Sequence, residues 1–511
     1  MRKAIQLFIE DDKTQLEKEE ALLPVITKNY NKSLTSFQRI VPSIYKTLKN
    51  HTSQHNSVFV NKEGEVDIVE SSSGTVFYGS QVSKSISRHV ERFLATPQQL
   101  QLSSAEGRPT LTPPPSRENA LVVFGVGLGW HLAELLNATD IKHIVVYEPN
   151  IDYLVCSLYA GVWPRIFDIA QKNKVSLYLQ LPSNGKSLYS DLNELHSAFG
   201  ISSSLVYFHY HCSEFDDIRD ELTANNWCLT RDLRPSVKEP RFENYVPKWT
   251  PVVSSSSWSA DNLDHDRFES NLKAFKKYFP DIADEFATYI PLHWQVVGNP
   301  AGEVNLFNVK HQTFLLGDNA KKESENIYAM FKDNPSRDEL VLNYSGGKLS
   351  PHFHYRTRVR IQNEVKKYKI DSAVLNREIK SLLLFGIGNG YQLQCLMDAH
   401  EVGKLFIYEP NRDFFYSSLF SIDWKALLEK MDFNESSIYL NIGDDGSNLV
   451  RDFLTQFDRV GSYNLANMFL FKSYDNDVLE PLLNNLREEI RLVIGLRDNF
   501  ENSRYIVSHS K

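Results

Sequence analysis

Cysteine is scarce in this sequence, and its placement excludes two kinds of structural site. Only 4 cysteines occur among 511 residues, and no two of them form a Cys-x-x-Cys pair. Zinc ribbons and disulfide frameworks both need cysteines that cluster at short spacings. We therefore expect neither kind of site, and a reducing cytoplasm is the compartment that this cysteine usage favours.

An excess of basic residues and long apolar runs are also missing. The formal net charge is -8 and the pI is near 6.0, whereas proteins that hold a nucleic-acid backbone need a surplus of lysine and arginine. No apolar stretch reaches the roughly 18 residues that a membrane-spanning helix requires. We expect no nucleic-acid partner and no membrane span.

Familiar catalytic patterns are absent as well. The sequence contains no Ser-His-Asp order, no H-E-x-x-H motif and no Walker motif. The catalytic residues, if the chain has any, are therefore unknown from sequence.

What the sequence does contain is an internal repeat. LVVFGVGLGWHLAELL (121–136) aligns without a gap with LLLFGIGNGYQLQCLM (382–397), and the alignment continues through VVYEPNIDYLVCSLYAGVW and FIYEPNRDFFYSSLFSIDW. Upstream, Phe37 aligns with Phe275 at a closer spacing, which places an insertion of copy two within SRDELVLNYSGGKLSPHFHYRTRVRIQ. Similarity over several segments at fixed spacing indicates a tandem duplication.

Each copy alternates strand-like and helix-like segments. An apolar strand leads through three glycines into a helix, and a second strand, further helices and a third strand follow. This alternation predicts a mostly parallel sheet with helices on both faces. The predicted fold class is α/β, with two tandem Rossmann-like doubly wound units, each preceded by a small α+β subdomain that begins with a helical pattern.

Two polar segments read as connectors. The proline-rich GRPTLTPPPSRENA separates front and back of copy one, and PVVSSSSWSADNLDHD, which ends in helix-capping residues, separates the copies. The expected parts are the N-terminal helices and small subdomain of copy one (1–115), its Rossmann-like unit (116–250), the linker and small subdomain of copy two with the insertion (251–375), and its Rossmann-like unit (376–511).

A glycine turn and a glutamate form the candidate site of each copy. A turn of this kind presents backbone amides and a helix N-terminus to a ligand, and a carboxylate about twenty residues later can accept hydrogen bonds from ribose. The pattern predicts a nucleotide-type site in each copy, made of Gly125, Gly127, Gly129 and Glu148 in the first and of Gly386, Gly388, Gly390 and Glu409 in the second.

A purely structural role is the alternative that the residues leave open. The glycines can serve only to permit a tight turn with close helix packing, and the glutamate can cap a helix that begins at Pro149 or Pro410.

The kind of nucleotide is restricted by two departures from known fingerprints. Trp130 and Tyr391 stand where a dinucleotide-binding turn has its last glycine, so we do not expect NAD or FAD. The turn is similar to that of S-adenosylmethionine methyltransferases, but Val123 and Leu384 stand where those enzymes usually carry an acidic residue. S-adenosylmethionine therefore remains an open possibility and no cofactor is certain.

Two further groups of residues could bind ligands. His209 and His211 in VYFHYHCSEF, with Cys212 beside them, would share one face of a strand and could ligate a metal, although a strand surface is the interpretation we favour. We predict no metal site. The insertion carries alternating cations that could grip a phosphate or a sugar carboxylate, with a solvated hairpin as the favoured alternative: His352, His354, Arg356, Arg358 and Arg360.

The repeated segments resemble the N-terminal domain of the motility accessory factor (Maf) family. FGVGLGWHLAELL with VVYEPNIDYLVCSLYAGVW, and FGIGNGYQLQCLM with FIYEPNRDFFYSSLFSIDW, carry the resemblance, and NLKAFKKYFPDIADEF and GEVNLF are similar too. It covers most of residues 25–510. It implies a bacterial, cytoplasmic glycosyltransferase that attaches nonulosonic acids, such as pseudaminic or legionaminic acid, to serines and threonines of flagellin from a CMP-sugar donor. Flagellin or another acceptor protein and a nucleotide-sugar are the partners it implies.

One feature of that family is missing from the sequence. Catalysis is assigned there to a following central domain with a motif like G-x-G-P-S-L, and this chain ends at NFENSRYIVSHSK, about where such a domain would begin. We expect either a truncated Maf-like protein or a longer chain that continues past Lys511. A methyltransferase-like enzyme and a non-catalytic scaffold are the alternatives.

Overall fold

The computed structural model describes most of the chain in two compact units. The residues it describes are 12–71, 74–102, 120–229, 245–253, 257–333, 375–444 and 468–474, with a few single positions besides. The first unit comprises Arg2–Lys238 with Val246–Val252, and the second comprises Glu239–Tyr245 with Val253–Lys511. Each unit holds one copy of the repeat and is described by itself. The division of each copy into two domains stays a prediction.

The front of the first unit combines helices with a β-hairpin. Its elements are α1 (Asp12–Ile40), α2 (Pro42–Asn50), β1 (Asn56–Val60), β2 (Val66–Glu70) and α3 (Val82–Ala95). The two strands pair antiparallel. The first two helices are separate because Pro42 lacks the amide that would continue α1, whereas a proline fits the first turn of a new helix.

A five-stranded sheet forms the back of the first unit. Its elements are β3 (Gln98–Gln101), β4 (Ala120–Phe124), α4 (Trp130–Ala138), β5 (His143–Tyr147), α5 (Ile151–Ala160), α6 (Trp163–Asn173), β6 (Ser176–Gln180), α7 (Leu188–Phe199), β7 (Ser203–Phe208) and α8 (Ser213–Ala224). The order is β3-β7-β4-β5-β6, with β3 antiparallel and the others parallel. Along the chain the parallel strands therefore run third, second, first, fourth, an order known from doubly wound sheets.

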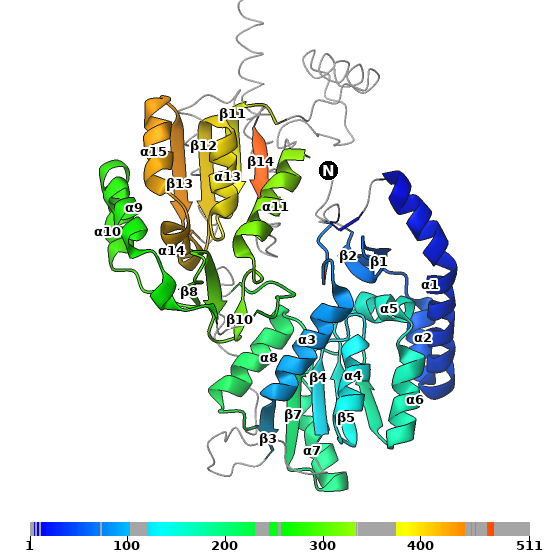
Figure 1. The fold of residues 1–511 in the computed structure, drawn as a ribbon. Helices are drawn as coiled ribbons and strands as arrows, with labels where there is room; N and C mark the ends of the chain where they lie inside the picture. Colours follow the sequence, from blue (N-terminus) through cyan, green and yellow to red (C-terminus); the bar gives the residue numbers. More distant parts are fainter. Residues whose placement is uncertain are drawn as a thin grey trace, which may run out of the picture. The chain divides into compact units, whose positions relative to one another are not determined.

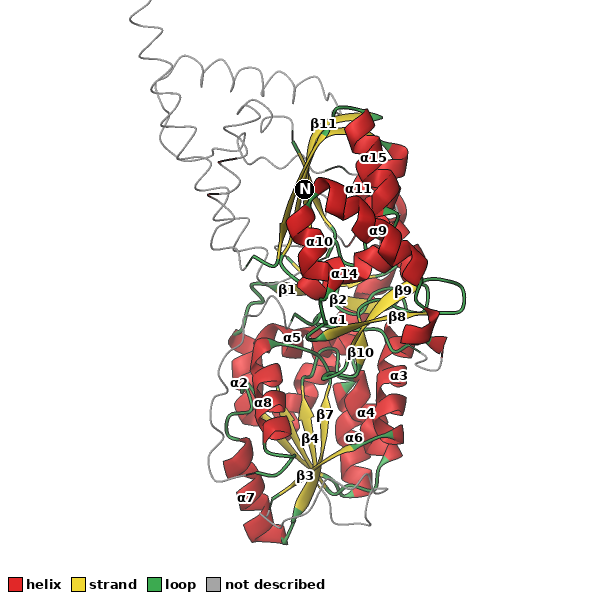
Figure 2. Cartoon of the chain, turned by 90° about the vertical axis from the view of Figure 1, so that its left-hand side faces the viewer, coloured by secondary structure: helices red, strands yellow, loops and turns green. Residues whose placement is uncertain are grey.

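Helices cover both faces of this sheet. All residues of β4 are fully buried, and they alternate between two hydrophobic clusters. Leu121 and Val123 pack with α4 and α6, whereas Val122 and Phe124 pack with α7 and α8. Figure 2 shows the strands between these two helix layers. The continuous apolar run of β4 follows from this arrangement, because both of its faces must be apolar.

The second unit repeats this plan (Figure 1). Its elements are η3 (Ala260–Asn262), α9 (His265–Tyr278), α10 (Pro280–Ala287), β8 (Trp294–Gly298), β9 (Val304–Asn308), β10 (Thr313–Phe314), α11 (Ala320–Asp333), β11 (Glu378–Phe385), α13 (Tyr391–Ala399), β12 (Glu401–Glu409), α14 (Arg412–Ser421), α15 (Trp424–Phe433), β13 (Ser437–Ile442) and β14 (Phe469–Lys472). The sheet order β13-β12-β11-β14 is parallel throughout and again runs third, second, first, fourth. The predicted α/β class is confirmed.

The front of the second unit also preserves the helix break. Pro280 opens α10 directly after α9, as Pro42 opens α2 in the first unit. The segment between the copies ends as predicted in a helix cap, because the side chain of Asp264 accepts a hydrogen bond from the Arg267 amide at 2.9 Å. Trp258 within that segment is buried against Phe314, so the segment is partly folded onto the second unit. None of the helices in the described ranges is both long and apolar enough to cross a lipid bilayer.

One aspartate joins front and back in the first unit. Asp152, in the first turn of α5, accepts hydrogen bonds from the backbone amides of Gln54, His55 and Asn56 at 2.9–3.2 Å. Its other oxygen lies 2.6 Å from Nε2 of His51. The loop that enters β1 is therefore fixed to a helix of the back sheet.

Asp413 makes the same joint in the second unit. It accepts hydrogen bonds from the amides of Leu292, His293 and Trp294 at 2.8–2.9 Å and from the Tyr289 hydroxyl at 2.7 Å. The two networks correspond position by position along the alignment of the copies. The sequence predicted the duplication but not this joint.

The joint of the second unit can be tested by Asp413→Ala. The substitution leaves three backbone amides without their acceptor, so we expect the free energy of unfolding of the second unit to fall by about 3 kcal/mol in urea denaturation. Asp398→Ala is the control, because Asp398 is exposed and its one hydrogen bond among the described residues comes from the side chain of Gln394. We expect the loss in this variant to stay within about 0.5 kcal/mol. Equal losses in the two variants would contradict the proposed joint.

Candidate functional site

The glycine turns lie at the C-terminal ends of parallel strands in the two sheets. The first follows β4 directly and the second follows β11, and all six glycines have positive φ. Gly129 (φ +81) immediately precedes α4, where a side chain would be strained and would press on Val162 at 3.0 Å. Gly390 (φ +89) holds the same place before α13. Backbone conformation and close packing are therefore sufficient reasons for a glycine at both positions.

Glu148 lies beneath the first turn and is fully buried. Its carboxylate accepts hydrogen bonds from the amide of Val126, inside the turn, at 2.7 Å and from the amide of Asn150 at 2.9 Å. The structure thus brings the predicted glycines and glutamate together. The partners of the carboxylate are groups of its own chain.

Glu409 has the same surroundings in the second unit. It is fully buried and accepts hydrogen bonds from the amides of Ile387 at 2.6 Å, Gly388 at 3.2 Å and Asn411 at 2.9 Å. The two predicted sites are therefore equivalent in their central contacts. Ribose contact by either glutamate stays a prediction.

A tyrosine that the sequence analysis missed completes each site. Tyr210 and Tyr474 each donate a hydrogen bond to the glutamate of their unit at 2.7 Å. Their rings also lie against the first glycine of the turn, where an added Cβ on Gly125 or Gly386 would collide with them. The signal that could have revealed them is a tyrosine two residues after the fourth parallel strand in both copies.

Burial and hydrogen bonding act in opposite directions on both glutamates. Removal from water raises the pKa of Glu148 and of Glu409 to about 7, against a usual value of 4.5. The amide and tyrosine donors favour the charged form and limit the rise. Beside each glycine turn there is thus a glutamate that can change its protonation state near neutral pH.

The helix after each glutamate begins two residues later than the structural alternative assumed. Asn150 caps α5 by accepting a hydrogen bond from the Asp152 amide at 3.0 Å, and Asn411 caps α14 in the same way. The glutamate bonds the amide of this asparagine and does not itself cap the helix. The helices begin at Ile151 and Arg412, so Pro149 and Pro410 precede them.

The two turns differ in what covers the middle glycine. In the first unit the Tyr78 hydroxyl lies where a side chain on Gly127 would go and accepts a hydrogen bond from the Leu128 amide at 3.2 Å. Leu316 stands at the equivalent position of copy two, and the atoms nearest to a Cβ on Gly388 would be 3.4 Å away. A tyrosine therefore closes the first turn, and among the described residues no equivalent hydroxyl covers the second.

His209 is not on a strand surface, and that expectation was wrong. It follows the end of β7, is 1% exposed, and hydrogen-bonds the hydroxyls of Tyr78 at 2.7 Å and Tyr207 at 3.2 Å. Its ring stacks on that of His131 with 3.5 Å between centroids. Burial lowers the pKa of both histidines, that of His131 to about 3, so both are neutral near physiological pH.

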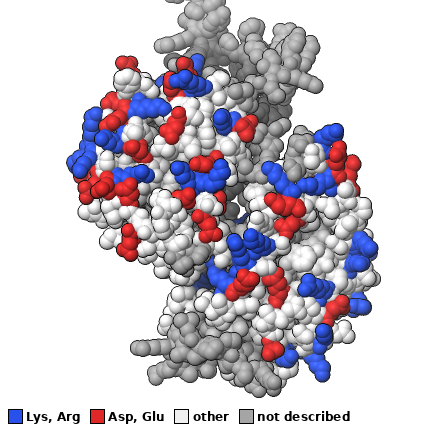
Figure 3. Space-filling model, in the orientation of Figure 1, with Lys and Arg blue, Asp and Glu red and all other residues white. Residues whose placement is uncertain are grey.

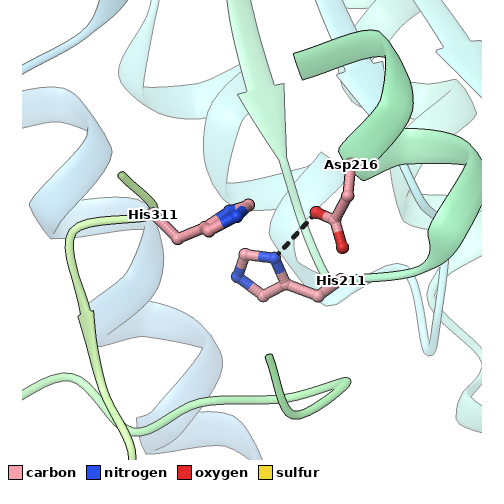
Figure 4. A group of neighbouring side chains, drawn as sticks. All are labelled: His211, Asp216 and His311. Atoms are coloured by element: carbon pink, nitrogen blue, oxygen red, sulfur yellow. Dashed lines mark hydrogen bonds and ion pairs between the residues drawn. The ribbon is translucent and has the colours of Figure 1, made fainter. Parts of the chain in front are cut away.

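His211 has a separate partner in the same unit. Its Nδ1 lies 3.0 Å from the Asp216 carboxylate of α8, as Figure 4 shows. Cys212 precedes α8 as a free thiol. His209 and His211 therefore have different hydrogen-bond partners. Figure 4 also labels His311, which belongs to the second unit.

The last predicted group is the set of cations in the insertion of copy two. His352, His354, Arg356, Arg358 and Arg360 lie outside the described residues. Their proposed grip on a phosphate or sugar carboxylate stays a prediction.

The electrostatics of the turn predict a pH-dependent effect of Tyr474→Phe. Because the folded pKa of Glu409 is raised, its contribution to stability is complete below pH 4.5 and is lost as the pH rises through about 7. Loss of the Tyr474 hydroxyl raises that pKa further. We expect the free energy of unfolding to fall by about 1.5–3 kcal/mol at pH 8, where the carboxylate is charged, and by about 1 kcal/mol at pH 5.

Urea denaturation at the two pH values provides the measurement. Tyr278→Phe is the matched control, because it removes a tyrosine–carboxylate hydrogen bond of 2.9 Å to Asp432 at the exposed surface. Its effect should remain within about 0.5 kcal/mol at both pH values. A Tyr474→Phe loss that does not change with pH would show that the hydroxyl does not act on a titrating carboxyl.

Comparison with known proteins places these features in a family. The family model described as the glycosyltransferase Maf N-terminal domain matches residues 29–112, 104–226 and 267–495. No curated protein matches the chain. Among solved structures, the chain is similar to the Maf glycosyltransferase from Magnetospirillum magneticum AMB-1 at 20% identity and a TM-score of 0.35, over 45% of this chain and 36% of that chain. Since the family model matches both copies and most of the sequence, the chain belongs to the glycosyltransferase Maf family, whose N-terminal domain it carries in repeated form.

Proposed function

We propose that this protein acts in the glycosylation of bacterial flagellin, where a nonulosonic acid is transferred from a CMP-activated donor to serine or threonine. The observation that carries the proposal is the match of the Maf N-terminal domain to both copies of the repeat. The cytoplasm is the proposed compartment, and the four free cysteines support it, because thiols stay reduced there.

Within this function we assign recognition to the two repeats. Their best-placed polar groups are Glu148 and Glu409, which lie at the sheet edge where ligands of α/β proteins usually bind. The pKa of each carboxyl is about 7, so that a charged form is present near neutral pH and can accept hydrogen bonds from a ribose. The donor nucleotide and the acceptor protein are the proposed partners, and the transfer step is assigned to no residue of this chain.

Ribose contact requires an exchange of hydrogen bonds. The turn amides that bond each glutamate belong to the backbone, whereas Tyr210 and Tyr474 carry their hydroxyls on side chains. We propose that the tyrosine hydroxyl leaves and a ribose hydroxyl takes its place. The carboxylate then keeps the same number of donors, so that little hydrogen-bonding energy is lost.

Calorimetric titration with CMP tests the nucleotide part of the proposal. We expect Glu409→Ala and Glu148→Ala to weaken CMP binding by about 1.5–3 kcal/mol, which is the value of a hydrogen bond to a charged group. Tyr474→Phe and Tyr210→Phe should tighten it, because the ribose no longer competes with a hydroxyl. Unchanged affinity in all four variants would remove the ribose role, and binding of S-adenosylmethionine in place of CMP would favour the methyltransferase-like alternative.

The flagellin part is tested in cells. Flagellin from a strain that lacks this gene, compared by intact mass spectrometry with flagellin from the parent strain, should lose the mass of its nonulosonic acids at serines and threonines. Re-expression of the complete gene should restore that mass. A flagellin mass that does not change on deletion would exclude the proposed function.

A further inference from the structure

The first unit has a local excess of positive charge that the composition of the chain conceals. Residues 21–62 contain no aspartate or glutamate, although the whole chain carries a net charge of -8. This segment includes the C-terminal half of α1 and all of α2. Its exposed cations on these two helices are Lys28, Lys32, Arg39, Lys46 and Lys49.

These five side chains form no ion pair with another described residue. We call them the basic surface. Figure 3 shows blue atoms along the edge of the first unit that α1 and α2 form in Figure 1. The neighbouring helix α6 adds exposed Arg165 and Lys172 and only one acid, Asp168. The local charge therefore stays positive after the neighbours are included.

A groove lies within the basic surface. It has a volume of about 590 Å³ and is lined by one face of α1 and by the start of α6: Pro24, Thr27, Lys28, Asn31, Lys32, Thr35, Ser36 and Pro164. Two of the five cations, Lys28 and Lys32, line the groove. Apolar side chains flank it on α1, where Leu23 is 60% exposed and Val25 is 53% exposed.

The second copy carries acids at two of the five equivalent positions. Lys28 aligns with Asp266 and Lys46 aligns with Asp284, and both aspartates are exposed on α9 and α10. From residue 21 onward the helix pair of the first copy carries cations and no acid, whereas α9 and α10 carry five acids beside four cations, with Lys277 at the place of Arg39. The fold itself therefore does not require the positive charge.

We propose that the basic surface binds an acidic protein segment that also carries apolar side chains. Lys28 and Arg39 are separated by about 16 Å along α1, which is too far for one phosphate or one carboxylate and suits an extended series of acids. The apolar residues beside the lysines provide the second kind of contact. This inference goes beyond the proposed function, because it requires neither the nucleotide nor flagellin.

Two other anionic partners are less compatible with the same helix. Nucleic acid and anionic lipid both present a continuous negative charge. The first turns of α1 would face it with three acids, Glu17, Glu19 and Glu20, which outnumber Lys13 and Lys18 there. A protein segment can place its acids only opposite the basic half of the helix. Charge complementarity along α1 thus favours a protein partner.

The test uses the full chain and a fluorescein-labelled peptide of glutamates interspersed with leucines. Its reference is the same peptide with glutamine at every glutamate. We expect the acidic peptide to bind with an affinity that falls with added salt, and the glutamine peptide to bind weakly. Lys28→Asp combined with Lys46→Asp, which introduces the residues found at the same positions of copy two, should weaken acidic-peptide binding by about tenfold.

The matched control changes the same charge elsewhere. Lys321→Asp combined with Lys425→Asp alters two exposed helical lysines of the second unit and should leave peptide binding unchanged. Circular dichroism confirms that both variants are folded. Equal loss in the two variants, or equal binding of the two peptides, would overturn the proposal. So would binding of phosphatidylserine vesicles or single-stranded DNA that exceeds peptide binding and that the first variant weakens.

Discussion

A fully buried carboxylate lies at the end of the second parallel strand of each sheet, directly after β5 in the first unit and as the last residue of β12 in the second. The surrounding segments supply its hydrogen bonds. An acid removed from water is costly unless its own chain provides donors. Glu148 and Glu409 receive them from the glycine turn, from the asparagine before the next helix and from a tyrosine beyond the last parallel strand. Because these donors come from three separate segments, one carboxylate fixes the relative positions of all three.

Comparison of the copies separates what the fold requires from what it tolerates. The internal contacts recur: Trp163 donates to Ser157 in the first unit, and Trp424 donates to Ser418 in the second. The groups around the middle glycine do not recur, and neither do the charges at Lys28 and Lys46, where the second copy has Asp266 and Asp284. The copies therefore share these internal contacts and differ in surface charge.

The sequence predicted the duplication, the α/β class and the meeting of glycines and glutamate, because local spacing determines each of them. It missed Tyr210 and Tyr474, which reach the glutamate from the far end of the sheet, where only the folded topology makes them neighbours. It misplaced His209, because alternation resembled a strand that in fact ends at Phe208. Contacts between distant segments leave no periodic signal, so these features required the structure.

The joint at Asp152 and Asp413 bears on how such a chain could arise. A fragment that contained only the sheet would leave the aspartate without its donors, and a fragment that contained only the front would leave three amides without an acceptor. The duplication in this chain covers front and back together, so each copy retains both the aspartate and the amides that bond it.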